Sequence, residues 1–377
     1  MEKKFIKIKI LFTIPNFDTA GSGKALLNVA KNLDRKFFEP HIACFHNRGD
    51  FFKIVEKSNI PVHIHKTSHE MIPRIKGFMK CLTLAKYFKS LNVDLIHSFH
   101  YGPDYSEALA AKIALIPWLY TKKNMNWGGL SKNGWYLRSL LSKHILVQNS
   151  DMVKEFFPRL NKLTLVHRGV DLQEFKKSKK NKQLLDKYNL KPENKIILCI
   201  ANLHPAKGVE VLIESFLMIS KKKSNLKLFI VGDNKNEYAE ELMHISKNSK
   251  YSKNIIFTGK VFDVKKFYSI ADLFILPTLS KGRREGSPVS LLEAISSGVS
   301  VLASEVSGIK DILNGYNEAL FEPGNAIELS KKIKKKLFEK KCSSLDQKIV
   351  KHIKNNFDIK IESHKHGEVY KKLLRRN

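Results

Sequence analysis

The chain has 377 residues, of which 43% are hydrophobic and 27% charged, and its formal net charge at pH 7 is +31. A chain of this length exceeds the size at which one hydrophobic core usually stops growing, so we expect two globular domains; the composition excludes a disordered or fibrous protein. No stretch reaches the roughly 18 uncharged apolar residues of a membrane-spanning helix, so the protein is not expected to cross a membrane.

The positive charge is spread along the chain. Residues 1–175 contain 27 Lys and Arg against 14 Asp and Glu, a balance of +13, and residues 176–377 contain 40 against 22, a balance of +18. Nucleic-acid binders usually concentrate charge in a recognisable module, which is absent, so we expect no nucleic-acid partner. Solvated lysine-rich surfaces are the simplest interpretation, and peripheral contact with an anionic membrane is the second; the run at residues 331–336 fits either.

The cysteines indicate a reducing compartment. Cys44, Cys81, Cys199 and Cys342 lie far apart and form no C-x-x-C pair, which argues against both a disulfide framework and a structural zinc site. The N-terminus begins like a signal peptide, but lysines at positions 7 and 9 interrupt the apolar run that such a peptide needs. A cytoplasmic protein is expected.

Short β-branched runs alternate with helical patterns, which is typical of parallel sheets covered by helices. In the first half we expect strands at residues 6–13, 41–45, 62–65, 95–98, 118–121, 144–148 and 163–167. Apolar residues at helical spacing predict a helix over residues 23–33 between the first two strands.

A polar, lysine-rich stretch at residues 175–195 is the expected domain boundary. After it, strands are expected at residues 196–201, 226–231, 255–258, 273–277 and 300–303. The fold class is therefore α/β, with two Rossmann-like domains facing each other across a cleft, in residues 1–175 and 176–355, followed by a terminal helix in residues 356–377. In open α/β sheets, ligands bind outside the carboxyl ends of the strands.

A glycine-rich segment, Gly21-Ser22-Gly23, lies between the first strand and the first helix. It is not a P-loop, because Asp18 stands where that motif has glycine and Ala25 replaces the magnesium-binding hydroxyl. Backbone N–H groups at a helix start can still contact an anion or a sugar.

Two histidines, His97 and His100, end the strand at residues 95–98. At least one is expected to reach the cleft, although a structural role is commoner for a histidine. No further His, Cys or carboxylate triplet has metal-ligand spacing nearby, so we expect no metal site. His364 and His366, in the lysine-rich tail, are expected to be solvated.

Lys207 follows the strand at residues 196–201 and precedes a helix from Val209. Its compact charge at the carboxyl end of a strand can contact phosphate oxygens. The alternative is an ordinary surface lysine.

The segment at residues 276–298 has the densest pattern of candidate site residues. A strand ends at Pro277, a loop with Arg283, Arg284 and Glu285 follows, and a helix is expected over residues 288–297, with Glu293 more than one turn inside it. Both glutamates can face one ligand, and the arginines and the helix N-terminus supply positive potential for a diphosphate. Alternatively, Glu293 is a solvated helix residue and Glu285 a helix-dipole partner.

In order and spacing, residues 196–335 resemble the retaining glycosyltransferases of family 4, which have the GT-B fold. The matching segments are residues 202–208, 231–233, 257–261, 271–277, 285–293, 304–308 and 321–324. The first half resembles the family more loosely, through residues 21–23, 97–100 and 168–171.

The resemblance implies roles at a donor site. Glu293 would contact the ribose, Glu285 the transferred sugar and Lys207 the diphosphate, while the backbone near Gly259 and Val261 would contact the base. The family's usual arginine is absent, because Asn202 takes one common position and His204 another. Diphosphate contact by His204, Arg283 or Arg284 therefore stays open, and Gly232, Gly286 and Ser287 complete the expected donor-site residues.

The acceptor side has fewer matches. Many members have a histidine after the strand that follows His100, whereas this chain has Lys122-Lys123-Asn124. His100 is therefore the best candidate for an acceptor-side catalytic group, and the Gly21-Ser22-Gly23 segment is a further ligand contact. The resemblance also implies that the terminal helix packs back on the N-terminal domain.

The predicted activity is transfer of a hexosyl unit from a nucleotide diphosphate sugar, with UDP favoured, to a polysaccharide, lipopolysaccharide or lipid-linked acceptor. The resemblance implies retention of configuration and no metal or other cofactor. The cysteines predict a cytoplasmic protein, and association with the inner face of the membrane is the second interpretation of its charge. One alternative is a sugar-nucleotide epimerase of the same fold, which would need no acceptor. The other is a basic binding protein that keeps the fold without nucleotide-sugar affinity.

Overall fold

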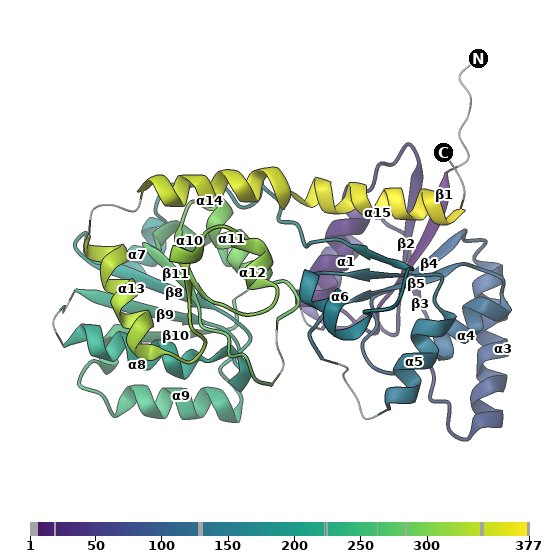
Figure 1. Cartoon of the computed structure of the whole chain (residues 1–377), viewed down its shortest axis with the longest axis horizontal. Helices are drawn as coiled ribbons and strands as arrows, with labels where there is room; N and C mark the ends of the chain where they lie inside the picture. The colour runs from purple at the N-terminus through teal and green to yellow at the C-terminus, as the bar shows by residue number, and fades with distance from the viewer. Residues whose placement is uncertain are drawn as a thin grey trace, which may run out of the picture. The chain divides into compact units, whose positions relative to one another are not determined.

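The computed structural model describes residues 7–18, 20–126, 131–221, 223, 225–261, 263–282, 285–339 and 343–374. The chain divides into two compact units. Unit 1 consists of Met1–Arg168 and Ile359–Asn377, and unit 2 of Gly169–Asp358. Each unit has its own parallel sheet with helices on both faces (Figure 1).

Unit 1 has a seven-stranded parallel sheet in the order β3-β2-β1-β4-β5-β6-β7. Its strands are β1 Ile8–Thr13, β2 Phe38–Cys44, β3 Val62–Ile64, β4 Leu95–Ser98, β5 Trp118–Lys122, β6 His144–Val147 and β7 Leu163–Leu165. All seven strands expected in the first half are confirmed, with ends shifted by a few residues.

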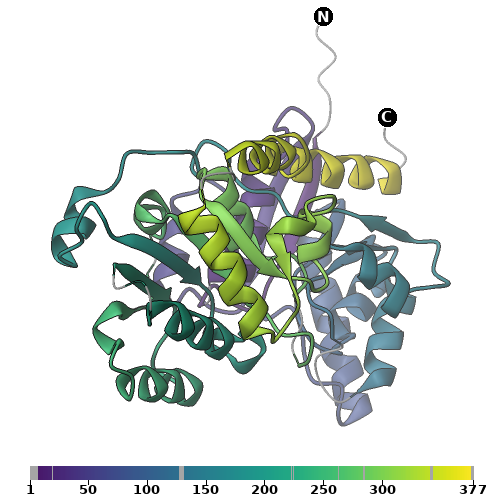
Figure 2. The ribbon, with the colours of Figure 1, turned by 60° about the vertical axis from the view of Figure 1, so that its left-hand side comes forward.

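Helices cover both faces of this sheet (Figure 1 and Figure 2). They are α1 Ala20–Asn32, α2 Asp50–Glu56, α3 Arg74–Ser90, α4 Ser106–Ile113, α5 Lys132–Leu141, α6 Ser150–Phe156 and α15 Ile359–Leu374. Alternate residues of β1 serve the two faces: Ile10 and Phe12 join one apolar cluster, and Leu11 joins the other. Burial on both faces explains why the strands read as continuous apolar runs.

Helix α1 begins at Ala20, three residues before the expected start. Gly21, Ser22 and Gly23 therefore lie within the first turns of the helix, and the expectation that Gly21 and Ser22 precede the helix is wrong. A Cβ on Gly23 would lie 2.7 Å from Cδ1 of Phe17, so the close approach of an aromatic ring explains this glycine.

The C-terminal helix α15 packs along α1 in unit 1 (Figure 1). The hydroxyl of the fully buried Tyr370 lies 2.7 Å from Nδ1 of His97, whose Nε2 lies 2.8 Å from Oγ1 of Thr121. Arg168 and Glu362 form a buried ion pair at 3.2 Å. Polar contacts between buried groups thus fix α15 to His97 on β4 and to Arg168, the last residue of the first segment of unit 1.

His366 faces the interior of unit 1. It is 2% exposed, and its Nδ1 lies 2.8 Å from the carbonyl oxygen of Glu362. The expectation of a solvated side chain is therefore wrong for His366, because α15 turns this face toward the sheet. His364, two residues earlier, has a side chain that is 75% exposed.

We predict that His366 makes unit 1 less stable in acid. Burial lowers the pKa of His366 from 6.5 to about 4, so the unfolded chain takes up the proton first. Stability present above pH 6.5 is lost as the pH falls toward 4, and the difference corresponds to roughly 3 kcal/mol. His366→Gln should flatten the pH dependence of the urea midpoint in this window. Tryptophan fluorescence follows this unit, because all three tryptophans lie within residues 118–135.

His364→Gln is the matched control, since it removes an exposed histidine from the same helix. It should leave the pH dependence of the wild type. If both variants keep the slope of the wild type between pH 6.5 and 4, the burial of His366 does not control acid stability.

Unit 2 has a six-stranded parallel sheet in the order β10-β9-β8-β11-β12-β13. Its strands are β8 Lys195–Ile200, β9 Leu226–Val231, β10 Ile255–Gly259, β11 Leu273–Leu276, β12 Ser300–Ser304 and β13 Leu320–Phe321. The five strands expected here are confirmed. Strand β13 was not predicted, because two residues are too few to show a periodic pattern.

The helices of unit 2 lie on both faces of its sheet. They are α7 Lys182–Lys187, α8 Val209–Ser220, α9 Glu237–Lys247, α10 Lys265–Ile270, α11 Val289–Ser296, α12 Ile309–Ile312, α13 Ala326–Phe338 and α14 Ser343–Asn356, with short 3-10 turns η1 Pro205–Lys207, η2 Ser252–Asn254 and η3 Asn317–Ala319. Ile196 and Leu198 of β8 pack in one cluster, Ile197 and Cys199 in the other. Within the described parts of both units, no helix is long and apolar enough to span a membrane.

Candidate functional site

The central strands of unit 2, β8 and β11, are neighbours at the point where the strand order reverses. Ligands of open α/β sheets bind outside the carboxyl ends of the strands at this point. The loop after β8 leads to Lys207 at the end of η1, and the loop after β11 contains Glu285. Topology therefore brings together two residues that are 78 positions apart.

Lys207 and Glu285 form an ion pair between Nζ and Oε1. The hydroxyl of Thr278, at the end of β11, donates to the same carboxylate oxygen at 3.3 Å. The lysine and glutamate side chains are 22% and 12% exposed, so the pair is only partly shielded from water. A ligand at this edge of the sheet can therefore reach both charged groups.

Glycines allow the loops around this pair to approach closely. Gly208, directly after Lys207, has φ 60°, and a Cβ there would lie 2.3 Å from the carbonyl oxygen of Pro277. A Cβ on Gly232 would lie 2.1 Å from a carbonyl oxygen at the end of β8, and one on Gly308 would lie 2.3 Å from that of Gly286. Each contact excludes any side chain, so the loops after β8, β9, β11 and β12 pack backbone to backbone.

Glu293 lies on α11 and is only 5% exposed. The hydroxyl of Tyr268 lies 3.0 Å from its Oε2 and 3.1 Å from the carbonyl oxygen of Ser290. Burial raises the pKa of Tyr268 well above its usual value, and the charge of Glu293 acts in the same direction. The alternative of a solvated Glu293 is therefore wrong, because the carboxylate is held inside unit 2.

The other expected donor-site residues divide into two groups. Asn202 and His204 are exposed in the loop that carries Lys207, and Nδ1 of His204 accepts from the backbone N–H of Ala206 at 3.2 Å. The remaining described ones, at the ends of β9 and β10 and before α11, are Gly232, Gly259, Val261, Gly286 and Ser287. Arg283 and Arg284 lie outside the described residues.

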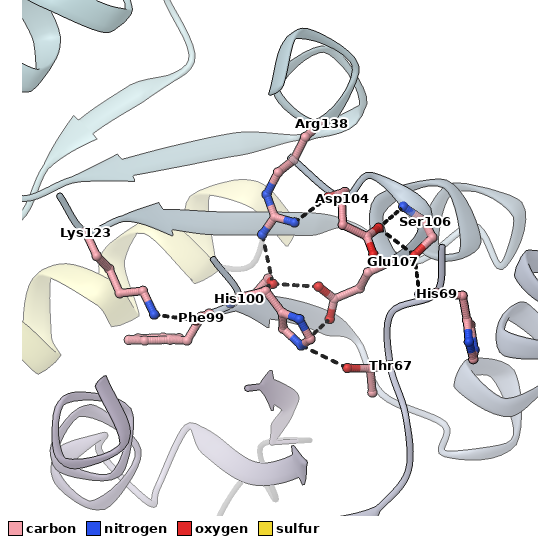
Figure 3. Close-up of polar contacts among 10 residues, drawn as sticks. Thr67, His69, Phe99, His100, Asp104, Ser106, Glu107, Lys123 and Arg138 are labelled. Carbon is pink, nitrogen blue, oxygen red and sulfur yellow. Dashed lines mark hydrogen bonds and ion pairs between the residues drawn. The ribbon is translucent and has the colours of Figure 1, made fainter. Parts of the chain in front are cut away.

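In unit 1, the structure places His100 in a buried network (Figure 3). Its side chain is 4% exposed, with Nε2 3.0 Å from Oγ1 of Thr67 and 4.0 Å from Oε1 of Glu107. Burial lowers the pKa of His100 well below its usual value, and the charges of Arg138 and Lys123 add to the effect. His97 is also buried, so neither histidine is presented at the surface of unit 1, contrary to expectation.

Glu107 and Arg138 are the charged centre of this network (Figure 3). Ser98 donates to Oε2 of Glu107 at 2.5 Å, and Arg138 contacts Oγ of Ser98 at 3.2 Å and the carbonyl oxygen of Asp104 at 2.7 Å. Burial raises the pKa of Glu107 to about 7, while the charge of Arg138 opposes that shift. Sequence reasoning missed both residues, although a glutamate before the alanine-rich run of α4 was a usable signal.

The start of α1 and the segment after β4 meet near this network. Oγ of Ser22 donates to the hydroxyl of Tyr101 at 3.2 Å, and Tyr101 is 42% exposed. Nζ of Lys123 donates to the carbonyl oxygen of Phe99 and lies 3.8 Å from the centroid of the Tyr101 ring. Of the expected acceptor-side residues, Ser22 is therefore the one with a partly exposed polar side chain.

The described part of the chain contains no group of three or more His, Cys, Asp or Glu residues that could hold a metal ion. The charged groups at the carboxyl edge of the unit 2 sheet are suited to an anionic ligand, through Lys207, and to hydroxyl groups, through Glu285.

Two Rossmann-like units, each with a parallel sheet covered by helices, are the architecture of GT-B glycosyltransferases. A model of the family described as "Glycosyltransferase Family 4" matches residues 19–174, and one described as "Glycosyl transferases group 1" matches residues 180–355. The chain belongs to glycosyltransferase family 4 and is a glycosyltransferase.

A relative agrees with this assignment in sequence, and two solved structures agree with it in fold. The chain is 29% identical over 272 residues, 66% of its length, to the N,N'-diacetylbacillosaminyl-diphospho-undecaprenol alpha-1,3-N-acetylgalactosaminyltransferase of Campylobacter jejuni, 69% of which is covered. The crystal structure of a glycosyltransferase from Rickettsia africae has a TM-score of 0.86 and 21% identity, covering 99% of this chain and 100% of that one. HepE of Anabaena, in complex with UDP and glucose, has a TM-score of 0.80 and 18% identity, covering 96% of this chain and 99% of that one.

We predict that Gly308→Ala destabilises unit 2 more than Gly315→Ala does. Both glycines have positive φ, 78° and 83°, but only the first has a carbonyl oxygen in the way; a Cβ on Gly315 meets nothing within 4 Å. The positive φ should cost roughly 1 to 2 kcal/mol in each variant. The contact with Gly286 should add roughly 1 to 3 kcal/mol in the first.

Urea unfolding followed by circular dichroism measures the difference between the two variants. Equal midpoints would mean that the loops after β11 and β12 can separate at no cost, and the close packing around Gly286 would not be a constraint on the site.

Proposed function

We propose that this glycosyltransferase moves a hexosyl unit from a UDP-sugar to a polysaccharide, lipopolysaccharide or lipid-linked acceptor, with retention of configuration. The observation that carries the proposal is the partly exposed Lys207–Glu285 pair at the switch point of unit 2, with the buried Glu293 on the adjoining helix. This arrangement offers one cation for a diphosphate and two carboxylates for hydroxyl groups of a donor.

Both ends of the reaction have support from similar proteins. The HepE structure contains UDP and glucose, which favours a UDP-sugar as donor. The Campylobacter jejuni relative is named for a diphospho-undecaprenol acceptor, which favours a lipid-linked acceptor.

In the proposed donor complex, Lys207 leaves Glu285 and pairs with the diphosphate. Glu285 then accepts hydrogen bonds from hydroxyl groups of the transferred sugar, and Glu293 accepts from the ribose. Tyr268 holds the Glu293 carboxylate through the contact at 3.0 Å. His204 and Asn202 are exposed in the loop that carries Lys207, and we propose that they contact the phosphates.

Departure of the diphosphate is the demanding step, because negative charge accumulates on the leaving group while the sugar becomes oxocarbenium-like. A preorganised cation stabilises this charge where it develops. Lys207 supplies the cation in our proposal, assisted by the N–H groups of Gly286 and Ser287 before α11. We propose that no metal ion is needed, because lysine and backbone donors meet the charge of the diphosphate.

On the acceptor side, we propose that the first turn of α1 and Tyr101 contact the acceptor. His100 is enclosed, so we assign it a positioning role: through Thr67 and Glu107 it joins the segment after β3 to α4. The described cysteines Cys44, Cys81 and Cys199 are free and buried, which fits a reducing compartment, and we propose a cytoplasmic location.

Lys207→Ala is expected to reduce transfer without unfolding the protein. Loss of a charge-assisted contact worth about 1.5 to 3 kcal/mol corresponds to a decrease in kcat/KM of roughly 10- to 150-fold. The decrease in kcat/KM is measured as transfer of radiolabelled hexose from UDP-hexoses to lipid-linked acceptors, in the presence of a metal chelator. Lys334→Ala, at an exposed lysine of α13, is the control and should transfer like the wild type.

Several outcomes would count against this proposal. Unchanged transfer by Lys207→Ala would remove the lysine from the site. If GDP binds more tightly than UDP in a calorimetric titration, the proposal of a UDP-sugar donor is wrong. Turnover of the donor to an epimer without acceptor would indicate an epimerase, and an inverted product seen by NMR would reject retention.

Glu285→Gln should separate nucleotide binding from transfer. The substitution removes the charge that competes for Lys207 in the free protein, so UDP, which lacks the sugar, should bind at least as tightly as it does to the wild type. Transfer should fall, because the amide is a weaker acceptor for the sugar hydroxyl groups. Glu293→Gln should instead weaken the binding of UDP, because Glu293 is proposed to contact the ribose. If Glu285→Gln weakens UDP binding equally, Glu285 holds the nucleotide and not the sugar.

A further inference from the structure

Exposed apolar side chains concentrate on α3 of unit 1. Fourteen large hydrophobic residues are exposed in the described chain, and five of them lie within residues 72–82. They are Ile72 at 86%, Ile75 at 79%, Phe78 at 47%, Met79 at 61% and Leu82 at 40% exposure. Single exposed apolar residues need no explanation, but a cluster marks a surface that meets a partner.

Helix α3 has two apolar faces. One face, made by Gly77, Cys81, Leu84, Ala85 and Phe88, is buried against unit 1, where α3 packs on α4. Ile75, Phe78, Met79 and Leu82 recur at spacings of three and four and share a second stripe, outside the buried face. A surface helix normally carries polar residues there, so packing within unit 1 does not account for this stripe.

The charge around the stripe has one sign. Between Glu70 and Asp94 the sequence contains no acidic residue. The basic residues in this interval are Arg74, Lys76, Lys80, Lys86 and Lys89, and all of them are exposed. Lys86 and Lys89 lie four and seven positions after Leu82, so they continue the apolar stripe along the same side of the helix.

The segment before α3 is fixed to the body of unit 1 (Figure 3). The backbone N–H of His69 donates to Oγ of Ser106 at 2.8 Å, and Oγ1 of Thr67 lies 3.0 Å from Nε2 of His100. The exposed residues therefore sit on an ordered scaffold. Because α3 follows the parallel strand β3, its apolar first half lies at the carboxyl edge of the sheet, the edge that also carries the start of α1 and Tyr101.

We propose that this surface, Ile72 with the exposed stripe of α3, docks on an anionic lipid bilayer. The apolar side chains enter the boundary between headgroups and acyl chains, and the surrounding lysines contact the lipid phosphates. A second copy of the chain is disfavoured, since two such surfaces would bring like charges together. Nucleic acid is disfavoured because Phe78 is the one aromatic side chain of this surface and aliphatic side chains do not stack on bases.

Docking would bring the carboxyl edge of the unit 1 sheet to the membrane surface. A lipid-linked acceptor could then reach the start of α1 without leaving the bilayer. This consequence rests on the proposed function, whereas docking itself does not, because vesicles can be bound without any sugar donor.

Sedimentation of the full-length protein with lipid vesicles tests the proposal. The wild type should bind vesicles of phosphatidylcholine with phosphatidylglycerol and not vesicles of phosphatidylcholine alone. Ile75→Ser with Met79→Ser should weaken the partition coefficient roughly tenfold or more, because the inserted area is lost. Lys86→Gln with Lys89→Gln should weaken it to a similar extent, at roughly fivefold per lysine. All four side chains are exposed, so folding should be unaffected.

Matched controls lie on helices of unit 2. Ile245→Ser with Ile327→Ser removes two exposed isoleucines, and Lys334→Gln with Lys335→Gln removes two exposed lysines from the densest basic run. Both should bind like the wild type. The proposal is overturned if the wild type binds neither vesicle, if the α3 variants bind unchanged, or if the controls weaken equally. A dimer in sedimentation velocity that the α3 variants abolish would assign the surface to a second copy.

Discussion

The ion pair between Lys207 and Glu285 is the contact on which the candidate donor site depends. An ion pair at the surface is worth about 0 to 1 kcal/mol, whereas breaking a fully buried one costs about 3 to 5 kcal/mol. At 22% and 12% exposure, this pair lies between the two cases. It is shielded enough to hold both side chains in place and open enough for an incoming diphosphate to replace the carboxylate. In the proposed donor complex, this exchange would leave Glu285 available to a hydroxyl group of the sugar.

The backbone around the pair limits where these charges can lie. Lys207 is followed by a glycine whose backbone touches that of Pro277 at the end of β11, and Gly286 is pressed against Gly308. Neither loop can shift toward its neighbour without a steric clash. Glu293, in contrast, is fixed by burial and by the hydroxyl of Tyr268. The two glutamates are therefore held by different means, one by a charge and one by packing.

Sequence patterns predicted most of this arrangement and missed what depends on three-dimensional packing. All twelve expected strands are present, because burial on both faces makes each strand a short apolar run, and β13 was too short to give that signal. The family resemblance at residues 202–208 and 285–293 predicted that Lys207 and Glu285 lie in one region, where they form an ion pair, whereas a shared site with Glu293 stays a prediction. The early start of α1 was missed, because two glycines are poor indicators of a helix. The burial of His97, His100 and His366 was missed, because a histidine is usually exposed and the sequence does not show that a buried partner, such as Tyr370 for His97, is available in the fold.

The end of the chain also shows why sequence order and structural order differ here. Unit 1 is completed by α15, so unit 2 is inserted between two segments of unit 1. The chain enters unit 2 at Gly169 and leaves it at Asp358, and these two segments lie side by side. The N–H of Val170 donates to the carbonyl oxygen of Phe357 at 2.8 Å, and Val170 pairs with Asp358 in a parallel bridge. After Asp358, Glu362 forms the ion pair with Arg168, and Tyr370 forms a hydrogen bond with His97. Without α15, Arg168 lacks the buried carboxylate of Glu362, and Phe12 lacks its contact with the ring of Tyr370. The first segment of unit 1 therefore reaches its final packing only when α15 has docked on it.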